Sequence, residues 1–255
     1  MMVKISSVHF CPIKSLSFQS AQTLIIKKDI GIVEDRIFAF SRGLNELDAK
    51  RIEKDPSDRQ LINFLTLKNS PVLNKYEFKY KNEIITILKD NKEIASYPIK
   101  EKENLSKKLL ELEPSLPNPT YLLKNELFPF YDTTSSSSIL NTVSLINLNS
   151  IKDFSKKINK DIEFKRFRGN IYIKDLKALE ERNWINKVIS INNTEFKVLK
   201  NIPRCSATNL KINSKEADIN LPNMLKKFYG HIDMGIYLIP LNNGQIQVGD
   251  EIDFN

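Results

Sequence analysis

One of the two cysteines in this 255-residue chain stands where a thiolate could do chemistry. Cys205 directly follows Arg204 and precedes a short polar run that begins with Ser206. The guanidinium would favour the ionised sulfur, and the hydroxyl and amide groups could donate hydrogen bonds to an anion. Such a thiolate is suited to bind a soft metal or to act as a nucleophile. The alternative is a buried, inert cysteine at the end of a strand, and the segment taken alone favours that alternative.

Two other stretches present polar side chains next to expected strands. In residues 9–17, a strand ends near a proline and is followed at once by Lys14 and Ser15. In residues 31–40, Arg36 stands at the mouth of an apolar strand. Its planar guanidinium would fit a phosphate, or it could simply pair with one of the acidic residues beside it. An ordinary strand end with solvated charges remains the alternative in both places.

A third stretch, residues 164–173, combines two arginines with a glycine and an amide. Arg166 and Arg168 are two residues apart and would share one face of a strand. Gly169 would let a ligand approach the backbone, and Asn170 offers its amide where the next strand begins. A bulge with two surface arginines is the competing interpretation.

The cysteine and histidine counts exclude several kinds of metal site. Cys11 and Cys205 cannot supply a disulfide framework, an iron–sulfur cluster or an all-thiolate zinc site, and they fit a reducing compartment. His9 and His231 are the only histidines, which argues against a multi-histidine site. His231 precedes Asp233 closely, but we interpret the pair as a helix end rather than a catalytic pair. Any transition metal would have to arrive with most of its ligands attached.

The charge balance permits an anionic partner without specifying one. The net charge is +8, and the basic residues are spread along the chain without a helix-turn-helix, zinc-finger or RNA-binding signature. We therefore expect no nucleic acid partner. No apolar run is long enough to span a membrane, and the first residues do not resemble an export signal. These features predict a soluble, cytoplasmic protein, which we expect to be a monomer.

Periodicity predicts a mainly β chain with a few helices, an α+β fold class. Strands are expected at 4–10, 23–28 and 36–41, and hairpins around residues 82, 192 and 243, where asparagines tolerate positive φ. Helices are expected at 105–112, 148–158 and 221–229. A proline- and serine-rich stretch between the helices expected at 105–112 and 148–158 interrupts regular structure. We therefore place a domain boundary between residues 125 and 126.

Taken in order, several segments resemble the MOSC family, named for the C-terminal domain of molybdenum cofactor sulfurase. No single segment is specific, but their order through nearly the whole chain is. They are CPIKSL, GIVEDRIFAF, VSLIN, FRGNIYI, NWINKVISI, PRCSATN, GHIDMGIYL and GQIQVGDEI.

The resemblance implies a fold, a cofactor and a set of site residues. The fold is a MOSC β-barrel at 126–255 behind a β-rich MOSC N-terminal domain at 1–125. The cofactor is the molybdenum cofactor, a molybdopterin whose metal Cys205 would ligate, with Cys205 also the catalytic residue. Pyridoxal phosphate binding is linked to the family by resemblance alone. The implied cofactor-binding residues are Lys14, Ser15, Arg36, Asp132, Arg168, Asn170, Arg204 and Ser206.

The implied activity is that of the amidoxime-reducing members of the family: reduction of a small N-hydroxylated or N-oxide substrate. With so few cysteines, the chain would need a separate redox protein as electron donor. Two departures from the family pattern stand out: Cys11 where a tyrosine is common, and Gly169 where a proline is common. Cys11 could therefore lie near the site and pair with Cys205 on oxidation. A different function stays open, in which Cys205 carries a persulfide as a sulfur carrier for metal–sulfur assembly.

Overall fold

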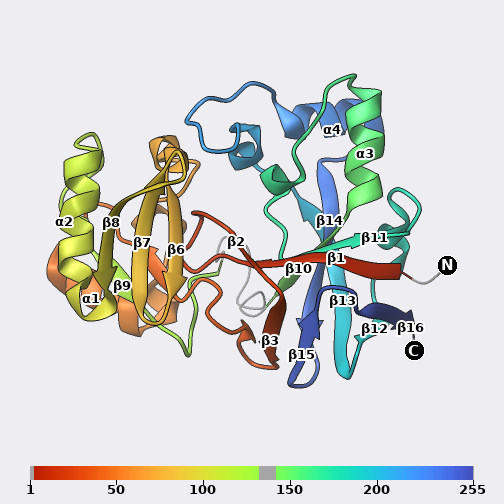
Figure 1. Ribbon diagram of the computed structural model, residues 1–255, viewed down its shortest axis with the longest axis horizontal. Helices are drawn as coiled ribbons and strands as arrows, with labels where there is room; N and C mark the ends of the chain where they lie inside the picture. Colours follow the sequence, from red (N-terminus) through yellow and green to blue (C-terminus); the bar gives the residue numbers. More distant parts are fainter. Residues whose placement is uncertain (1–2, 132–141, 255) are drawn as a thin grey trace.

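The computed structural model describes residues 3–131 and 142–254 and arranges them as two β-rich units side by side (Figure 1). Strands dominate and helices are few, so the predicted fold class, mainly β with a few helices, is confirmed. No helix in these residues is long and apolar enough to cross a membrane. The α-helices are α1 (Glu46–Lys54), α2 (Lys102–Leu112), α3 (Leu148–Lys157) and α4 (Leu221–Tyr229).

A closed barrel forms the unit on the right of Figure 1. Its strands follow the order β11, β10, β14, β13, β12, β16 and β1, and β11 also pairs with β1, which closes the ring. Closure pairs the backbone groups that an open sheet edge would expose. The strands are β1 (Val3–Phe10), β10 (Val143–Asn147), β11 (Ile171–Lys174), β12 (Val188–Ile191), β13 (Thr194–Pro203), β14 (Asp233–Pro240) and β16 (Glu251–Phe254), with β2 (Gln19–Ala21) extending the sheet beyond β1.

Apolar side chains fill the barrel because successive residues of a strand point to opposite faces. In β1, Val3, Ile5 and Val8 all face this core, although Ile5 and Val8 would point to opposite faces of a regular strand. The pairing register between β1 and β11 shifts between Ile5 and Ser7. This bulge lets both ends of β1 contribute to the core.

Small sheets, 3₁₀ turns and two helices form the unit on the left of Figure 1, the N-terminal unit. Its core contains Phe38, Phe40 and Phe78. The predicted hairpin at residue 82 is confirmed, because Asn82 and Glu83 both have positive φ between paired strands. Its elements are β5 (Phe38–Phe40), η1 (Pro56–Asp58), η2 (Leu61–Asn63), η3 (Pro71–Lys75), β6 (Glu77–Lys81), β7 (Ile84–Lys89), β8 (Lys92–Pro98), η4 (Ile99–Glu101) and β9 (Leu122–Lys124).

The barrel core and the Phe38-containing core of the N-terminal unit do not divide at the predicted boundary between residues 125 and 126. Val3, Ile26 and Ile32 pack in the barrel core, because β1 lies between β11 and β16 and because β3 pairs with β15. The first strands of the chain therefore belong to the barrel, and the two-domain division stays a prediction. The strands of this additional sheet are β3 (Thr23–Lys27), β4 (Gly31–Ile32) and β15 (Gly244–Gln247).

The three predicted helices are confirmed as α2, α3 and α4, whereas two other expectations were wrong. The hairpin expected around residue 243 does not form, since β15 leaves β14 and pairs with β3. Residues 164–167 were expected to be strand but form the 3₁₀ helix η5 (Phe164–Phe167). Helix α1 was not predicted, although Asn45 caps it by accepting the Asp48 N–H at 2.9 Å.

Candidate functional site

Cys205 lies on the surface at the end of a barrel strand. Arg204 separates it from the end of β13, and it directly precedes the 3₁₀ turn η7 (Ser206–Asn209). Its thiol is free and exposed, as is Ser206, so the interpretation as a buried, inert cysteine was wrong. Thr208 closes the turn, because both its N–H and its hydroxyl donate to the Cys205 carbonyl, at 3.1 and 2.8 Å. The backbone around the sulfur is thus held while the sulfur itself is accessible.

Arg168 lies next to Cys11 and interacts electrostatically with Cys205. Its backbone is in the left-handed region, with φ of 54°. One guanidinium nitrogen, Nη2, donates to the Leu16 carbonyl at 2.6 Å and is 3.9 Å from the Cys11 sulfur. Burial lowers the pKa of Arg168, and the positive charge of Arg36 lowers it further.

Arg36 reaches the same place from the loop before β5. It forms an ion pair with the fully buried Asp35. Burial alone would disfavour its charge, but Asp35 raises the pKa of Arg36 above the ordinary value. Its guanidinium lies over the rings of Phe18 and Tyr131, with 5.4 and 5.5 Å between the guanidinium carbon and the ring centroids. Arg168 lies over the same Phe18 ring at 5.0 Å, so this ring contacts both arginines.

Cys11 faces these groups from within the protein. Its thiol is fully buried and donates to the carbonyls of Ile13 at 3.0 Å and Leu16 at 3.4 Å. Burial raises the pKa of Cys11, so its sulfur is held as the neutral thiol. Its N–H donates to the Asp35 carboxylate at 2.6 Å. Its position near the site agrees with the expectation, whereas its pairing with Cys205 stays a prediction.

We call Cys11, Asp35, Arg36, Arg168 and Cys205 the arginine–thiol cluster. It brings together residues from both units of the fold, and it contains two guanidinium groups and one carboxylate. With Cys11 neutral, the cluster has an excess of positive charge next to an exposed sulfur. Such an arrangement favours an anionic ligand that also offers a soft metal to the sulfur.

Two more predicted residues, Lys14 and Ser15, form hydrogen bonds to the protein itself. The Lys14 ammonium group is buried and donates to the carbonyls of Phe130 at 3.1 Å and Tyr131 at 2.9 Å. The Ser15 hydroxyl accepts the N–H of Leu67 at 3.1 Å. Their predicted roles in cofactor binding stay predictions. Asp132 lies outside the described residues.

Asn170 ties two barrel strands to the cluster. It is buried, accepts the hydroxyl hydrogen of Ser144 at 2.8 Å and donates to the His9 carbonyl at 3.1 Å. It also hydrogen-bonds Asp35. The expectation that the neighbouring glycine leaves room for a ligand is not met: a Cβ at Gly169 would lie 2.7 Å from the Ile146 side chain. That glycine allows close packing.

The guanidinium group of Arg204 hydrogen-bonds backbone carbonyls of the barrel unit. Its Nε donates to the Met234 carbonyl at 2.9 Å and its Nη1 to the Phe167 carbonyl at 2.7 Å, and a further bond joins Nη2 to Met234. The side chain is 8% exposed. The geometry gives it a structural role beside Cys205, and its predicted contact with a cofactor stays a prediction.

Phe18 and Tyr131 were missed as parts of the site. Both rings contact guanidinium groups of the cluster, and Phe18 follows directly on the 9–17 stretch. Their only sequence signal was an aromatic ring near cationic residues, which is too common to be specific. The interpretation of His231 and Asp233 as part of a helix end rather than as a catalytic pair agrees with the structure. The Nδ1 of His231 accepts the Asp233 N–H at 3.2 Å and lies 3.8 Å from the Asp233 carboxylate.

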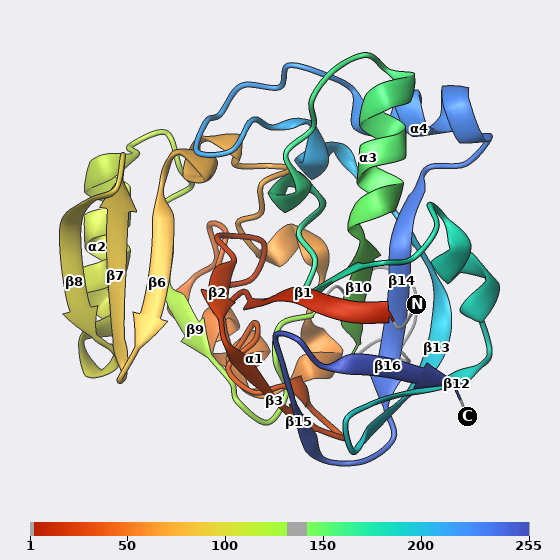
Figure 2. The same cartoon turned by 45° about the vertical axis from the view of Figure 1, so that its right-hand side comes forward.

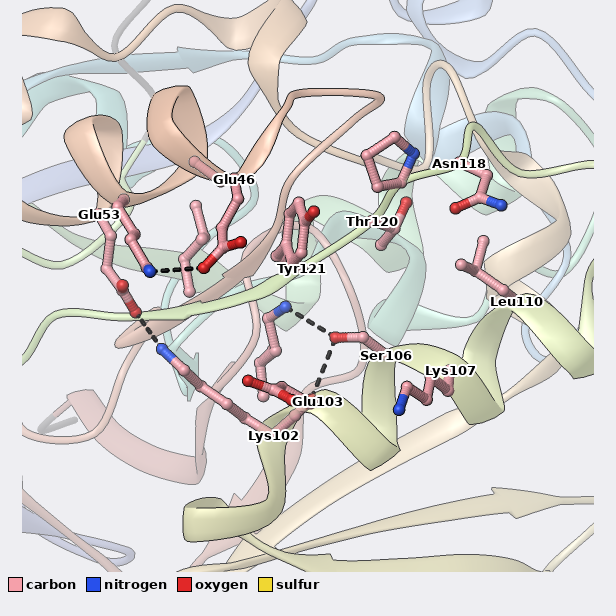
Figure 3. Close-up of a pocket in the computed structure, with 15 residues that line it drawn as sticks. Glu46, Glu53, Lys102, Glu103, Ser106, Lys107, Leu110, Asn118, Thr120 and Tyr121 are labelled. Atoms are coloured by element: carbon pink, nitrogen blue, oxygen red, sulfur yellow. Dashed lines mark hydrogen bonds and ion pairs between the residues drawn. The ribbon is translucent and has the colours of Figure 1, made fainter.

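A pocket of about 310 Å³ lies elsewhere, between α1 and α2 in the N-terminal unit (Figure 3). Its polar groups bind one another: Lys102 donates to Glu53 at 2.6 Å, and the Ser106 hydroxyl accepts the Leu122 N–H at 2.9 Å. None of the predicted cofactor-binding residues lines it. Its lining mixes acidic and basic side chains, which selects no ligand class.

Comparison with known proteins identifies a domain in the C-terminal half of the chain. The model of the MOSC domain matches residues 133–253. Mitochondrial amidoxime reducing component 2 from Bos taurus is 26% identical over 142 residues, and the match spans 50% of this chain but only 42% of that relative. The crystal structure of the YuaD protein from Bacillus subtilis has a TM-score of 0.45 at 10% identity, covering 99% of this chain and 94% of that one. For YiiM from Geobacillus stearothermophilus the TM-score is 0.37 at 15% identity, with 44% and 53% covered. The chain therefore contains a MOSC domain, at residues 133–253.

Proposed function

We propose that this protein is a molybdenum cofactor-dependent oxidoreductase that reduces small N-hydroxylated or N-oxide compounds. The observation that carries the proposal is the arginine–thiol cluster: an exposed cysteine that interacts electrostatically with Arg168, and a second guanidinium group, that of Arg36, which contacts the same Phe18 ring as Arg168 and is paired with the buried Asp35. MOSC domains are associated with the molybdenum cofactor in general. The similarity to an amidoxime reducing component supports the choice of substrate class.

The residues present fit this cofactor by their chemistry. Cys205 offers one soft thiolate, which is the ligand a molybdenum ion already chelated by a pterin dithiolene would still need. Arg36 and Arg168 offer charged donors to its phosphate and pterin groups. When bound, the cofactor supplies a metal that exchanges an oxygen atom and two electrons with the substrate.

The role of the chain is then to hold the cofactor and to orient it. Cys205 anchors the metal at the end of β13, with its backbone held by Thr208. The guanidinium groups of Arg36, which is paired with the buried Asp35, and of Arg168 compensate the negative charge of the ligand. In the net reaction the N–O bond breaks, two electrons and two protons are taken up, and the oxygen leaves as water. A separate redox protein would deliver the electrons.

The decisive test is metal and pterin analysis of protein made in a host that synthesises the cofactor. We expect stoichiometric molybdenum in the natural chain and a loss of roughly tenfold or more in Cys205→Ser, because oxygen is a poor substitute for the soft ligand. Ser96→Ala, an exposed change in β8, is the control and should keep the metal. Absence of both molybdenum and pterin from the natural protein would refute the proposal.

A sulfur carrier is the second candidate, favoured by the exposure of the Cys205 thiol. A persulfide carrier needs an accessible sulfur and no cofactor. Mass spectrometry of the native protein distinguishes the two functions. An added sulfur atom on Cys205 that a reductant removes, in protein without molybdenum, would replace the first proposal by this one.

A further inference from the structure

The turn that carries Cys205 is fixed to the barrel on its upstream side. The N–H of Arg204 donates to the Ile232 carbonyl at 2.9 Å. The guanidinium of the same residue donates to the Phe167 carbonyl at 2.7 Å. Cys205 therefore leaves the barrel at a point that cannot move independently of β14 and η5.

On its downstream side the same turn is fixed to the other unit. Leu210 is 7% exposed and packs in the hydrophobic core of the N-terminal unit, and Ala207 packs against that core. The other residues of this cluster all come from positions 13–122. Cys205 thus lies between Arg204, held by the barrel, and Ala207, held by the N-terminal unit. A relative movement of the two units would displace its sulfur.

Beyond Leu210 the chain forms a small hairpin that reaches across to the N-terminal unit, seen as the blue loop at the top of Figure 2. A bridge between Leu210 and Ala217 forms its base. At its tip, the Asn74 side chain of η3 donates to the carbonyls of Lys211 and Ser214, both at 2.7 Å. We call these two hydrogen bonds the Asn74 latch.

The base of the hairpin is tied to the barrel by charge. Asp218 accepts from Arg166 at 2.8 Å and from Lys160 at 2.9 Å. The hairpin therefore connects the units as Cys205 does, with its base on the barrel and its tip on η3. A second contact at the tip, from Asn213 to Glu77, is longer at 3.2 Å and exposed, so it contributes less.

We propose that Asn74 is a positioning residue for Cys205: its latch holds the hairpin against the N-terminal unit and so fixes the turn on which the sulfur stands. Asn74 does not contact the arginine–thiol cluster in any hydrogen bond described for it, and its effect passes through Leu210 and η7. The predicted effect of Asn74 on molybdenum retention rests on the proposed function. Its predicted effect on the reactivity of the Cys205 thiol does not.

The latch is tested first by proteolysis of metal-free protein. Lys211 and Lys215 at the hairpin tip are exposed and offer trypsin two sites. Asn74→Ala removes two hydrogen bonds to backbone carbonyls, which should raise cleavage at these sites roughly tenfold if opening precedes cleavage. Asn74→Asp keeps the shape but loses the donor, and should behave in the same way. Unchanged cleavage in both variants would overturn the latch.

The coupling is tested on the same proteins by the rate of Cys205 alkylation with iodoacetamide, well below the melting temperature. Cys205 is the exposed cysteine and Cys11 is fully buried, so peptide mass spectrometry reads both separately. We expect Cys205 to react roughly threefold faster or more in Asn74→Ala, with Cys11 still protected. Faster cleavage without faster alkylation would overturn the positioning role.

Asn242→Ala is the matched control, because Asn242 also bonds the backbone twice, to the Asn193 carbonyl at 2.9 Å and from the Glu195 N–H at 2.8 Å. It lies at the opposite end of β13 from Cys205. A general loss of stability would change alkylation in both variants alike and would overturn the inference. In protein loaded with cofactor, Asn74→Ala should also retain less molybdenum. If no protein contains molybdenum, the proposed function fails while the alkylation result still decides this inference.

Discussion

Replacing Arg204 with alanine is expected to lower the free energy of unfolding by about 4 kcal/mol, even without a cofactor. The side chain is 8% exposed and donates three hydrogen bonds to the carbonyls of Met234 and Phe167. Alanine would leave both carbonyls without their charged donor inside the protein. Urea unfolding of metal-free protein, followed by circular dichroism, measures the effect.

Two further variants serve as comparisons for the stability of Arg204→Ala. Arg204→Lys keeps the charge but not the planar set of donors, so its loss should be intermediate. Arg51→Ala removes an arginine that is 61% exposed and paired only with surface carboxylates, and should cost less than about 1 kcal/mol. If Arg204→Ala is as stable as Arg51→Ala and yet fails to retain molybdenum, the structural role is wrong and the predicted cofactor contact is right.

Lowering the pH from 6.5 to 4 is expected to reduce the free energy of unfolding by about 3 kcal/mol through the protonation of His9 in the unfolded chain. This histidine is 4% exposed, and burial, with a contribution from Lys165, lowers its pKa to about 4 from 6.5. Above pH 6.5 the ring is neutral in both the folded and the unfolded chain and has no effect. As the pH falls from 6.5 to 4, the unfolded chain takes up a proton that the folded chain refuses, so stability is lost over this interval.

The contribution of His9 is isolated by comparing His9→Gln with the natural chain at each pH. Glutamine can still hydrogen-bond the hydroxyls of Ser7 and Ser20, which lie 3.0 and 3.2 Å from the ring nitrogens. The variant should lose less stability between pH 7 and 4.5. Asp35 and Glu181 have raised pKa values because they are buried, so they act in the opposite direction in both proteins and cancel in the difference. Equal pH dependence of the two proteins would show that His9 is protonated in the folded state.

Local patterns were enough to predict much of the secondary structure. Helix α4 has Pro222 in its first turn and is capped by Gly230, whose φ is 78°. The hairpins at residues 82 and 192 have asparagines with positive φ where tight turns require it. These signals are local, since a cap or a turn depends on the backbone of a few consecutive residues. Where the partner is distant the prediction failed, as for β15, which pairs with β3 rather than with its sequence neighbour.

The candidate site was predicted in part. The stretches around Cys11, Arg36, Arg168 and Cys205 were singled out separately, and the ordered resemblance to a family joined them. The structure does bring these residues together. It also gives Arg204 a structural role, while the predicted cofactor contact of Arg204 stays a prediction, and it adds Phe18, whose ring contacts both guanidinium groups.

Residue types and their order were enough to predict the MOSC domain, the strand-rich fold class and the one cysteine that follows an arginine. The exposure of Cys205, the burial of Cys11 and the contact of Arg168 with the Cys11 sulfur could be seen only in the folded chain. Burial and charge compensation arise when segments far apart in the chain pack together. No local pattern around Cys205 could therefore reveal that its turn is held by the barrel on one side and by the N-terminal unit on the other.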